Sequence, residues 1–426
     1  MRDISDISPC RVAVMGQGYV GLPLAIRAVE VGFDVVGFDI DKTRIDALRK
    51  AETFIDDVHD DDLALAASTG RYLPTDDPAA LAGFDVAVVC VPTPLRDGAP
   101  DLSYIEDAAR VLAPHVTPGC CVILESTSYP GTTDEIFIPI LESGSGLCAG
   151  EQFSVGYSPE RIDPGNKTWH FRNTPKIISG VDQFSLQAVQ DFYGRLVEQT
   201  VPVGGTREAE LAKLLENTFR HVNIALVNEL AMYCHGLGLD VWSVIEAAAT
   251  KPFGFMKFTP GPGVGGHCLP IDPSYLSWQA RRSLGHAFRF VDIANDVNDH
   301  MPDYVVSRAI KQLNQQCKPV NGSRILLVGL AYKRNSRDTR QSPAIAVAKK
   351  LADLGADLRA VDPLVAGEDI PSFIQLVSCE LSQVSEADLV IVLTDHDGID
   401  WDLFELHADR VLDTRNRVRS PSAARL

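Results

Sequence analysis

The sequence predicts an α/β protein with two doubly wound parallel-sheet domains, joined by a long central helix and a helical middle domain. A strand, a glycine-rich turn and an apolar helix open the chain, and a second strand–turn–helix pattern begins at residue 323. Between them, residues 208–237 keep a helical periodicity, which predicts one helix roughly 45 Å long at 1.5 Å per residue. We expect domains at 1–203, 204–318 and 319–426.

The first strand, residues 11–15, runs into a glycine motif with the sequence Gly16-Gln-Gly18-Tyr19-Val20-Gly21. An apolar helix at 22–31 follows, and a second strand at 34–38 stops at Asp39. This order is typical of a Rossmann-like dinucleotide site, where glycines let the backbone approach the pyrophosphate and the acid binds the ribose. Asp39 would repel a 2′-phosphate, so NAD is the predicted cofactor; the alternative is a glycine turn without a ligand.

Further apolar strands are expected at 85–91, 121–124, 153–157, 177–179 and 200–203. The loops after these strands would meet at one edge of the sheet, where open α/β sheets bind ligands. Pro92 and Thr93 follow the first of them, and Glu160 and Arg161 follow the third. Hydroxyls in the loop 126–133 could contact a cofactor or water, or could cap the next helix.

The stretch from Phe258 to Tyr275 has four glycines and four prolines, which exclude a continuous helix or a central strand. Cys268 lies at the end of its glycine loop and Asp272 comes four residues later. A thiol near a carboxylate suggests covalent catalysis, with the Cys as nucleophile and the Asp as a base for water. The alternative is a tight loop with a buried, inert Cys.

Lys213 and Asn217 share a face of the central helix because they are four residues apart. They could line a cleft or belong to a solvated surface. In the second half, helices are expected at 240–250, 291–315 and 342–354, and strands at 323–329, 357–361, 387–394 and 410–413. The loop after the first of these strands carries Lys333, Arg334, Arg337 and Arg340, which would either bind an anion or form a solvated charged loop.

The composition limits the kinds of partner that we expect the protein to bind. A formal net charge of −18 argues against a nucleic acid partner. The sequence has no apolar run of membrane-spanning length and no signal-peptide pattern at its start. Its nine cysteines lack framework spacing, which predicts free thiols in a reducing cytoplasm, and we expect no bound metal.

Taken together, the motifs resemble one family along nearly the whole chain, the UDP-glucose/GDP-mannose dehydrogenases, which are NAD-dependent nucleotide-sugar 6-dehydrogenases. The similar segments are 16–25, 89–94, 125–127, 130–133, 157–162, 213–218, 261–273, 329–333 and 338–340. The resemblance implies that the first domain binds NAD, that the C-terminal domain holds the nucleotide of a UDP-sugar, and that the central helix builds a homodimer or higher homo-oligomer.

The resemblance also implies roles for single residues. Cys268 matches the nucleophile, Lys213 and Asn217 match the oxyanion-stabilising pair, and Asp272 and Thr127 match the groups that handle water and protons. Glu160 matches a substrate-side carboxylate. The cofactor contacts it implies are Gly16, Gly18, Tyr19, Val20, Gly21, Asp39, Arg44, Pro92, Thr93, Ser126, Thr127 and Arg340. The substrate contacts are Glu160, Arg161, Lys213, Asn217, Phe258, Gly263, Gly265, Gly266 and Lys333.

Two departures bear on the sugar. His267 stands before Cys268 and Pro164 stands four residues after Glu160, where many glucose enzymes carry Ser and Glu. Both look like the branch acting on UDP-N-acetylhexosamines, with UDP-GlcNAc first, while UDP-glucose or TDP-glucose stays an alternative, in polysaccharide or antibiotic pathways. A two-electron β-hydroxyacid dehydrogenase would need no Cys268 and no second nucleotide fold. A non-catalytic NAD-sensing protein would not need Cys268, Lys213 and Asp272 together.

Overall fold

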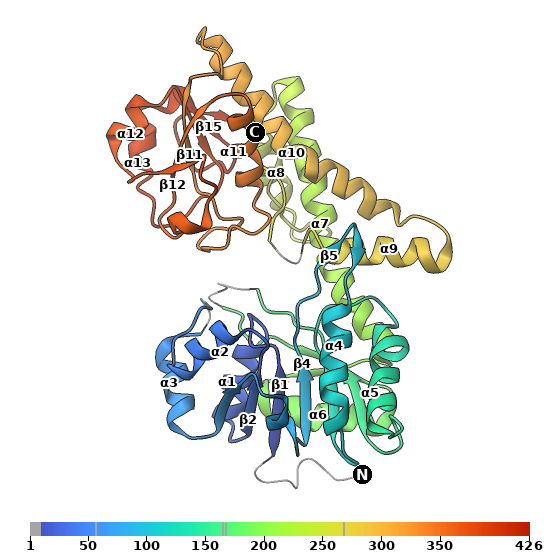
Figure 1. Ribbon diagram of the computed structural model, residues 1–426. Helices are drawn as coiled ribbons and strands as arrows, with labels where there is room; N and C mark the ends of the chain where they lie inside the picture. Colours follow the sequence, from blue (N-terminus) through green and yellow to red (C-terminus); the bar gives the residue numbers. More distant parts are fainter. Residues whose placement is uncertain (1–9, 56–57, 164–165, 167, 267–268) are drawn as a thin grey trace. The chain divides into compact units, whose positions relative to one another are not determined.

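The computed structural model describes the chain apart from residues 1–9, 56–57, 164–165, 167 and 267–268 (Figure 1). It divides into two compact units, Met1–Glu216 and Asn217–Leu426. Each unit contains a mostly or wholly parallel sheet packed with helices, which confirms the predicted fold class. The long helix α7 (Thr206–Leu237) begins in the first unit and continues into the second.

The first unit has an eight-stranded sheet in the order β10-β9-β8-β7-β4-β1-β2-β3. The strands are β1 (Arg11–Met15), β2 (Asp34–Phe38), β3 (Tyr72–Thr75), β4 (Val86–Val89), β7 (Cys121–Leu124), β8 (Ser154–Tyr157), β9 (Lys176–Gly180) and β10 (Thr200–Pro202). A separate antiparallel hairpin pairs β5 (Leu95–Arg96) with β6 (Ala99–Pro100).

One pair in this sheet departs from the parallel prediction, because β8 and β9 are antiparallel. A parallel neighbour needs a crossover, usually through a helix. The described residues between these two strands form no helix, so the chain turns back along the same edge. β10 then pairs parallel to β9 and keeps its direction.

The helices of the first unit pack on a core of apolar strand residues. They are α1 (Gly21–Glu30), α2 (Lys42–Arg49), α3 (Asp60–Ser68), α4 (Ser103–Leu112), α5 (Ile138–Ser145) and α6 (Gln183–Leu196). Alternate residues such as Val12, Val86 and Ile123 join one core with α1, α3 and α6. The helices α4 and α5 pack against each other (Figure 1). Of these helices, the sequence analysis had given a residue range only for α1.

The second unit has a six-stranded, fully parallel sheet in the order β13-β12-β11-β14-β15-β16. Its strands are β11 (Arg324–Val328), β12 (Asp357–Val361), β13 (Gln375–Leu376), β14 (Leu389–Val392), β15 (Val411–Asp413) and β16 (Ala424–Arg425). Its helices, besides α7, are α8 (Val241–Ala249), α9 (Asp272–Leu284), α10 (Arg289–Gln315), α11 (Pro343–Asp353), α12 (Leu381–Glu386) and α13 (Asp402–Glu405).

The two faces of this sheet pack against different helices. Leu327 and Ile391 belong to a core shared with α7, α8, α10 and α11. Leu326 and Val390, one position away on the same strands, belong to a second core with α12 and α13. Because successive side chains of a strand point to opposite faces, both faces of the central strands β11 and β14 are buried, and these strands are almost entirely apolar.

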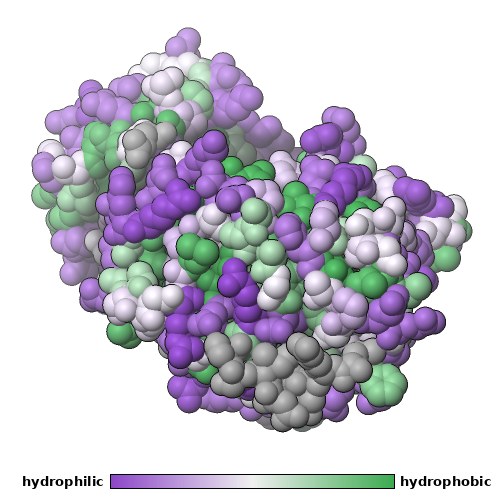
Figure 2. Space-filling model, turned by 60° about the horizontal axis from the view of Figure 1, so that its bottom comes forward, coloured by the Kyte–Doolittle hydropathy of each residue, from purple (hydrophilic) through white to green (hydrophobic). Residues whose placement is uncertain are grey.

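Hydrophilic side chains cover much of the face in Figure 2, and hydrophobic ones gather in separate patches between them. Within the described part of the chain, none of the helices is long and apolar enough to cross a membrane. The cysteines that the structure describes form no disulfides among themselves.

The helix α6 packs directly on the glycines of the antiparallel strands β8 and β9. This close packing leads to a prediction about stability. A Cβ at Gly180 would lie 2.1 Å from the Leu186 backbone nitrogen, whereas one at Gly194, exposed on α6, would meet nothing within 4 Å. We expect Gly180→Ala to lower the free energy of unfolding by roughly 1–3 kcal/mol, the cost of overpacking. Urea unfolding of the purified protein measures it.

The matched control is Gly194→Ala, which should raise the free energy of unfolding by about 0.5–1 kcal/mol because alanine favours a helix interior. A Gly180→Ala protein as stable as the wild type would contradict the close packing of α6 on β9.

Candidate functional site

The glycine turn after β1 is shaped by backbone contacts. Gly16 has a φ of +90°, and a Cβ there would lie 2.7 Å from the Cys90 carbonyl oxygen. A Cβ at Gly21 would lie 1.9 Å from the Gly16 oxygen, but one at Gly18 would meet nothing within 4 Å. The first and third glycines are therefore required by packing, and the second leaves open space above the turn. Since α1 begins without a side-chain cap, this cradle fits the pyrophosphate of a dinucleotide.

Asp39, at the end of β2, is buried and fixed by three hydrogen bonds. Its carboxylate accepts the backbone N–H of Gln17 at 2.8 Å and that of Asp41 at 3.0 Å. The Arg44 guanidinium pairs with it at 2.8 Å and also lies over the Phe54 ring. Asp39, the predicted ribose acid, and Arg44, another predicted cofactor contact, are therefore side by side at the end of β2.

Four of the other predicted cofactor residues follow β4 and β7. Ser126 is buried, and its hydroxyl donates to the carbonyl of Val91 at 2.8 Å, which ties the two strand ends together. Thr93 is buried, Pro92 is exposed, and Tyr19, Val20 and Thr127 are half-buried. The Ser126 hydroxyl is thus used in a hydrogen bond within the protein, and the Thr127 hydroxyl is the one closer to solvent.

A buried ionic cluster lies at the same edge and was missed by the sequence analysis. The Lys176 ammonium forms ion pairs with Glu125 and, at 3.3 Å, with Glu160. The Tyr193 hydroxyl donates to Glu125 at 2.6 Å, and the Cys90 thiol is 3.9 Å from the same carboxylate. Burial raises the pKa of Glu125 to about 7, against the opposing effect of Lys176. The nearby carboxylates raise the pKa of Lys176, although burial alone would lower it.

Lys213 is buried on α7, and its ammonium donates to the backbone carbonyl of Glu160. The Glu160 carboxylate accepts the backbone N–H groups of Arg161 and Ile162 within its own turn. Arg161 pairs with Glu216 of α7 at 2.6 Å. The first unit therefore brings Lys213, Glu160 and Arg161 together, but the Glu160 carboxylate is engaged by protein groups.

Glu210 is a second buried carboxylate that the sequence analysis did not identify. It lies on α7, one turn before Lys213, and is fully buried. It accepts hydrogen bonds from the Ser128 hydroxyl, from the Gly131 N–H at 2.6 Å, and from the N–H and hydroxyl of Thr133. Burial raises its pKa to about 7 although these bonds favour the charged form. Glu210 thus fixes the loop that carries Thr127 to α7.

In the second unit, the buried Asn217 side chain donates from its amide nitrogen to the Asp272 carboxylate, also buried. Its amide oxygen accepts a bond from Arg220 at 2.6 Å. Asp272 is the first residue of α9, so the last four residues of the predicted loop 258–275 are helical. Cys268 and His267 lie outside the described residues.

The glycines before Cys268 pack closely against the loop after β11. A Cβ at Gly265 would lie 2.6 Å from the Gln341 oxygen, and one at Gly266, whose φ is +87°, would lie 2.8 Å from the Tyr332 ring. A Cβ at Gly263 would lie 3.1 Å from Pro343. The Gly266 N–H also donates to the Arg340 carbonyl at 3.2 Å. Only glycine fits these positions, so this loop and the 330–343 loop form one packed layer.

The predicted basic cluster is largely paired with carboxylates. Arg334 forms ion pairs with Asp395 and Asp397, and Arg340 with Asp338 at 2.6 Å. Lys333 is half-buried. The sequence analysis missed the half-buried Arg415 of this unit: a Cβ at Gly261 would lie 2.5 Å from its guanidinium, whose pKa is lowered by burial. Phe258 packs edge-to-face on Phe219.

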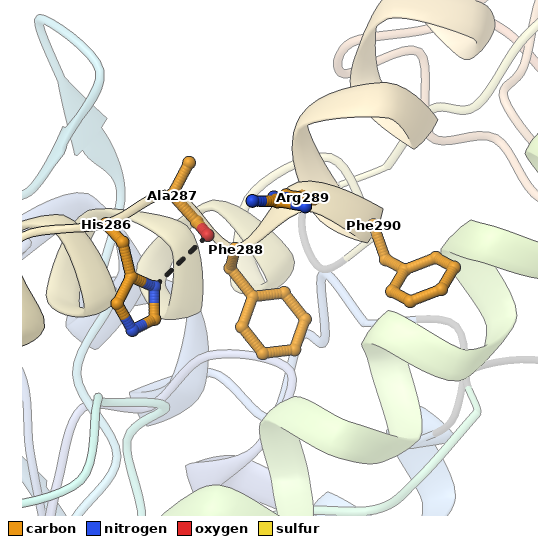
Figure 3. Close-up of a pocket in the computed structure, with 5 residues that line it drawn as sticks. All are labelled: His286, Ala287, Phe288, Arg289 and Phe290. Carbon is orange, nitrogen blue, oxygen red and sulfur yellow. Dashed lines mark hydrogen bonds between the residues drawn. The ribbon is translucent and has the colours of Figure 1, made fainter.

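A surface hollow at the corner between α9 and α10 lies apart from these residues. It is lined by five consecutive residues, His286 to Phe290 (Figure 3). The Phe290 side chain is 70% exposed, and His286 contacts the neighbouring Ala287 carbonyl at 3.4 Å. It contains none of the predicted site residues. Within the described ranges, no group of three His, Cys, Asp or Glu side chains could hold a metal ion.

Comparison with known proteins gives a consistent result. Three profiles of the UDP-glucose/GDP-mannose dehydrogenase family match the chain: its NAD binding domain at residues 10–197, its central domain at 207–300 and its UDP binding domain at 326–420. A UDP-N-acetyl-D-mannosamine dehydrogenase of Pyrococcus horikoshii is 35% identical and covers 96% of each chain. A UDP-N-acetyl-D-glucosamine 6-dehydrogenase of Pseudomonas aeruginosa is 39% identical over 84% of each chain.

Solved structures extend the comparison. The UDP-D-ManNAc dehydrogenase structure from Pyrococcus horikoshii aligns with a TM-score of 0.87 at 35% identity, covering 96% of both chains. A UDP-glucose dehydrogenase from Pyrobaculum islandicum aligns with a TM-score of 0.86 at 27% identity, covering 98% of this chain and 96% of the other. The fold is therefore shared by dehydrogenases named for different sugars.

The position of Asp39 predicts a preference for NAD over NADP on the order of 10²-fold in kcat/KM, because a carboxylate there repels a 2′-phosphate. Asp39→Asn should reduce the preference roughly tenfold, since it removes the charge and leaves Arg44 without its partner. Steady-state kinetics with both cofactors measures the ratio.

Asp41→Asn is the matched control, because Asp41 caps α2 two residues away and should leave the ratio unchanged. Equal kcat/KM for NAD and NADP in the wild type would contradict the assignment of Asp39.

Proposed function

The chain belongs to the UDP-glucose/GDP-mannose dehydrogenase family as an NAD-dependent nucleotide-sugar 6-dehydrogenase, and we propose that it oxidises the C6 hydroxyl of a UDP-N-acetylhexosamine, UDP-GlcNAc before others. The main support is the likeness, over most of both chains, to relatives named for UDP-N-acetyl-D-glucosamine and UDP-N-acetyl-D-mannosamine. His267 and the Pro164-Gly165 pair agree with that branch. UDP-glucose is the second candidate, because the Pyrobaculum islandicum structure named for it shares the fold.

The reaction proposed is a four-electron oxidation to the uronic acid. NAD, when bound, accepts the hydrides that leave C6. Among the described residues, Lys213 donates one hydrogen, to the Glu160 carbonyl; a lysine ammonium has three, so two remain there for an oxyanion. Asn217 donates one amide hydrogen to Asp272 and has a second. These donors support the role of the pair in stabilising the oxygen charge that develops at C6.

In the proposal, loss of the first hydride from C6 and of the proton from its hydroxyl gives an aldehyde. The Cys268 thiolate adds to this aldehyde, and loss of the second hydride leaves a thioester. Asp272 accepts a proton from the water that attacks this thioester, which releases the uronic acid and the Cys268 thiol. Burial of Asp272 and its bond from Asn217 support this role, because they hold the carboxylate in one orientation at the start of α9.

We also propose that a second copy of this chain covers α7. An apolar stripe repeats along this helix at spacings of four and seven residues and is at least 43% exposed at each position. Its residues are Leu211, Leu215, Phe219, Leu226, Tyr233 and Leu237. Such spacing places them on one face, which is the pattern of a helix that packs on a partner helix, and two copies would cover each other's stripe.

The substrate proposal is tested by kcat/KM for UDP-GlcNAc, UDP-ManNAc, UDP-glucose and TDP-glucose, with NADH counted per acid formed. We expect UDP-GlcNAc to lead and two NADH per uronic acid. Discrimination can be modest, since one small group contributes about 1–3 kcal/mol. A preference of more than tenfold for UDP-glucose or TDP-glucose would overturn the branch assignment. One NADH and no acid would overturn the four-electron reaction.

The covalent step predicts that Cys268→Ser traps the reaction, because an ester hydrolyses more slowly than a thioester. Mass spectrometry should find the sugar bound at position 268, or turnover should be absent. A Cys268→Ser enzyme with the wild-type rate would remove the thiol from the mechanism.

Lys213→Ala should lower kcat by a factor on the order of 10²–10³, the range for one oxyanion donor.

The stripe predicts that Leu226→Asp converts the oligomer to monomers, because a charge in an apolar interface is desolvated without a partner. Light scattering after size exclusion gives the mass. Leu65→Asp is the control, since Leu65 is similarly exposed but lies on α3. A monomeric wild type, or an unchanged Leu226→Asp oligomer, would contradict the proposed interface.

A further inference from the structure

The buried ionic cluster of the first unit exists because one strand runs backwards. The strands β4, β7 and β8 are parallel and end at the same edge, which carries Cys90, Glu125 and the turn with Glu160. Since β9 is antiparallel to β8, it begins at that edge, and its first residue is Lys176. The reversal thus places one ammonium between two carboxylates that come from other strands.

The cluster is closed to solvent. The side chains of Lys176 and Glu125 are 4% and 0% exposed, and that of Glu160 is 12% exposed. The ammonium also donates to the Pro159 carbonyl at 3.1 Å and lies over the rings of Phe171 and Tyr193. Apolar side chains of similar size would often stabilise such a position as well or better. The arrangement is therefore better explained by what the charges hold in place than by stability.

These charges hold in place the turn whose Glu160 carbonyl accepts the hydrogen bond from Lys213. The Glu160 carboxylate bonds to Lys176 through one oxygen and to the backbone N–H groups of Arg161 and Ile162 through the other. The same residue offers its backbone carbonyl to the Lys213 ammonium. Lys176 is thus linked to Lys213 through a single residue, and every group in this chain of contacts lies in the first unit.

We propose that Lys176 is a positioning residue for Lys213: it anchors the Glu160 turn, and the carbonyl of that turn fixes where the Lys213 ammonium stands. The inference rests on the proposed role of Lys213 at the developing oxyanion. It assigns the Glu160 carboxylate to the protein framework, where the resemblance had implied a contact with the substrate. Lys176 itself touches neither substrate nor cofactor in this account.

The test is a double-mutant cycle of Lys176→Met and Lys213→Ala. Lys176→Met alone should lower kcat on the order of tenfold to a hundredfold, the effect of a misplaced catalytic group, and leave the Kd for NAD unchanged. In the Lys213→Ala background the same change should cost no more than about twofold, because its route is already removed. If the two losses in kcat multiply in the double variant, the proposal is overturned.

A second readout does not depend on turnover. If Lys176 anchors the turn, hydrogen exchange of the Arg161 and Ile162 amides should be faster in Lys176→Met than in the wild type. Ser179→Ala is the matched control, because it removes a buried hydrogen bond to Tyr157 from the same strand and contacts no member of the cluster. It should lower stability and leave kcat and these amides unchanged. Unchanged exchange in Lys176→Met would overturn the proposal.

Loss of the ammonium leaves Glu125 buried without its cation, so Lys176→Met can fail to fold. The cycle is then run in the Glu125→Gln background, where the neutral side chain removes that cost. The proposed function is judged separately by wild-type turnover. A wild type inactive on every nucleotide sugar contradicts that function, whereas an active wild type with multiplying effects contradicts only the role of Lys176.

Discussion

The structure depends on one hydrogen-bonded arrangement that occurs in both sheets. After β1, Gly16 donates to the Phe38 carbonyl at 2.8 Å and Asp39 accepts the N–H of Gln17. After β11, Gly329 donates to the Val361 carbonyl at 2.9 Å and Asp362 accepts the N–H of Leu330 at 2.7 Å. Each turn is pressed against the end of a neighbouring strand, since a Cβ at Gly329 would lie 2.2 Å from the Thr394 oxygen. The backbone of each turn therefore lies at the edge of its sheet where the neighbouring strands end.

The two arrangements differ in what their carboxylate can still bind. Asp39 has the partly exposed Arg44 as its neighbour and lies beside the open space at Gly18. Asp362 is closed off by His396, and the ion-paired side chains are fully buried. Burial would raise the pKa of Asp362, but hydrogen bonds from His396 and from backbone N–H groups lower it to about 2. A sealed carboxylate cannot accept a ribose, which agrees with a glycine motif that occurs only in the first half of the sequence.

The fold was predictable where side chains are buried on both faces of a strand. Such strands are mostly apolar, although β12 also contains Arg359, and β1, β2, β7 and β12 begin and end at the predicted residues. The ionic cluster was not predictable, because a lone lysine before an apolar strand has the pattern of a solvated residue. Lys176 is buried only because β9 runs antiparallel, which no local pattern encodes. Glu210 was missed for a related reason: beside Lys213 it has the spacing of an ordinary surface pair on a helix, yet it binds the 128–133 loop.

The partners of Lys213 and Asn217 bear on the catalytic role that we propose for them. Both lie on one helix a turn apart, so helical geometry sets their spacing. The Lys213 ammonium is bonded to a carbonyl, and the carboxylate of that residue is matched by Lys176. A carboxylate in direct contact would neutralise Lys213 and weaken its attraction for an oxyanion. In the role that we propose for Lys176, this lysine holds the Glu160 carboxylate, and the charge of Lys213 stays available to the proposed oxyanion.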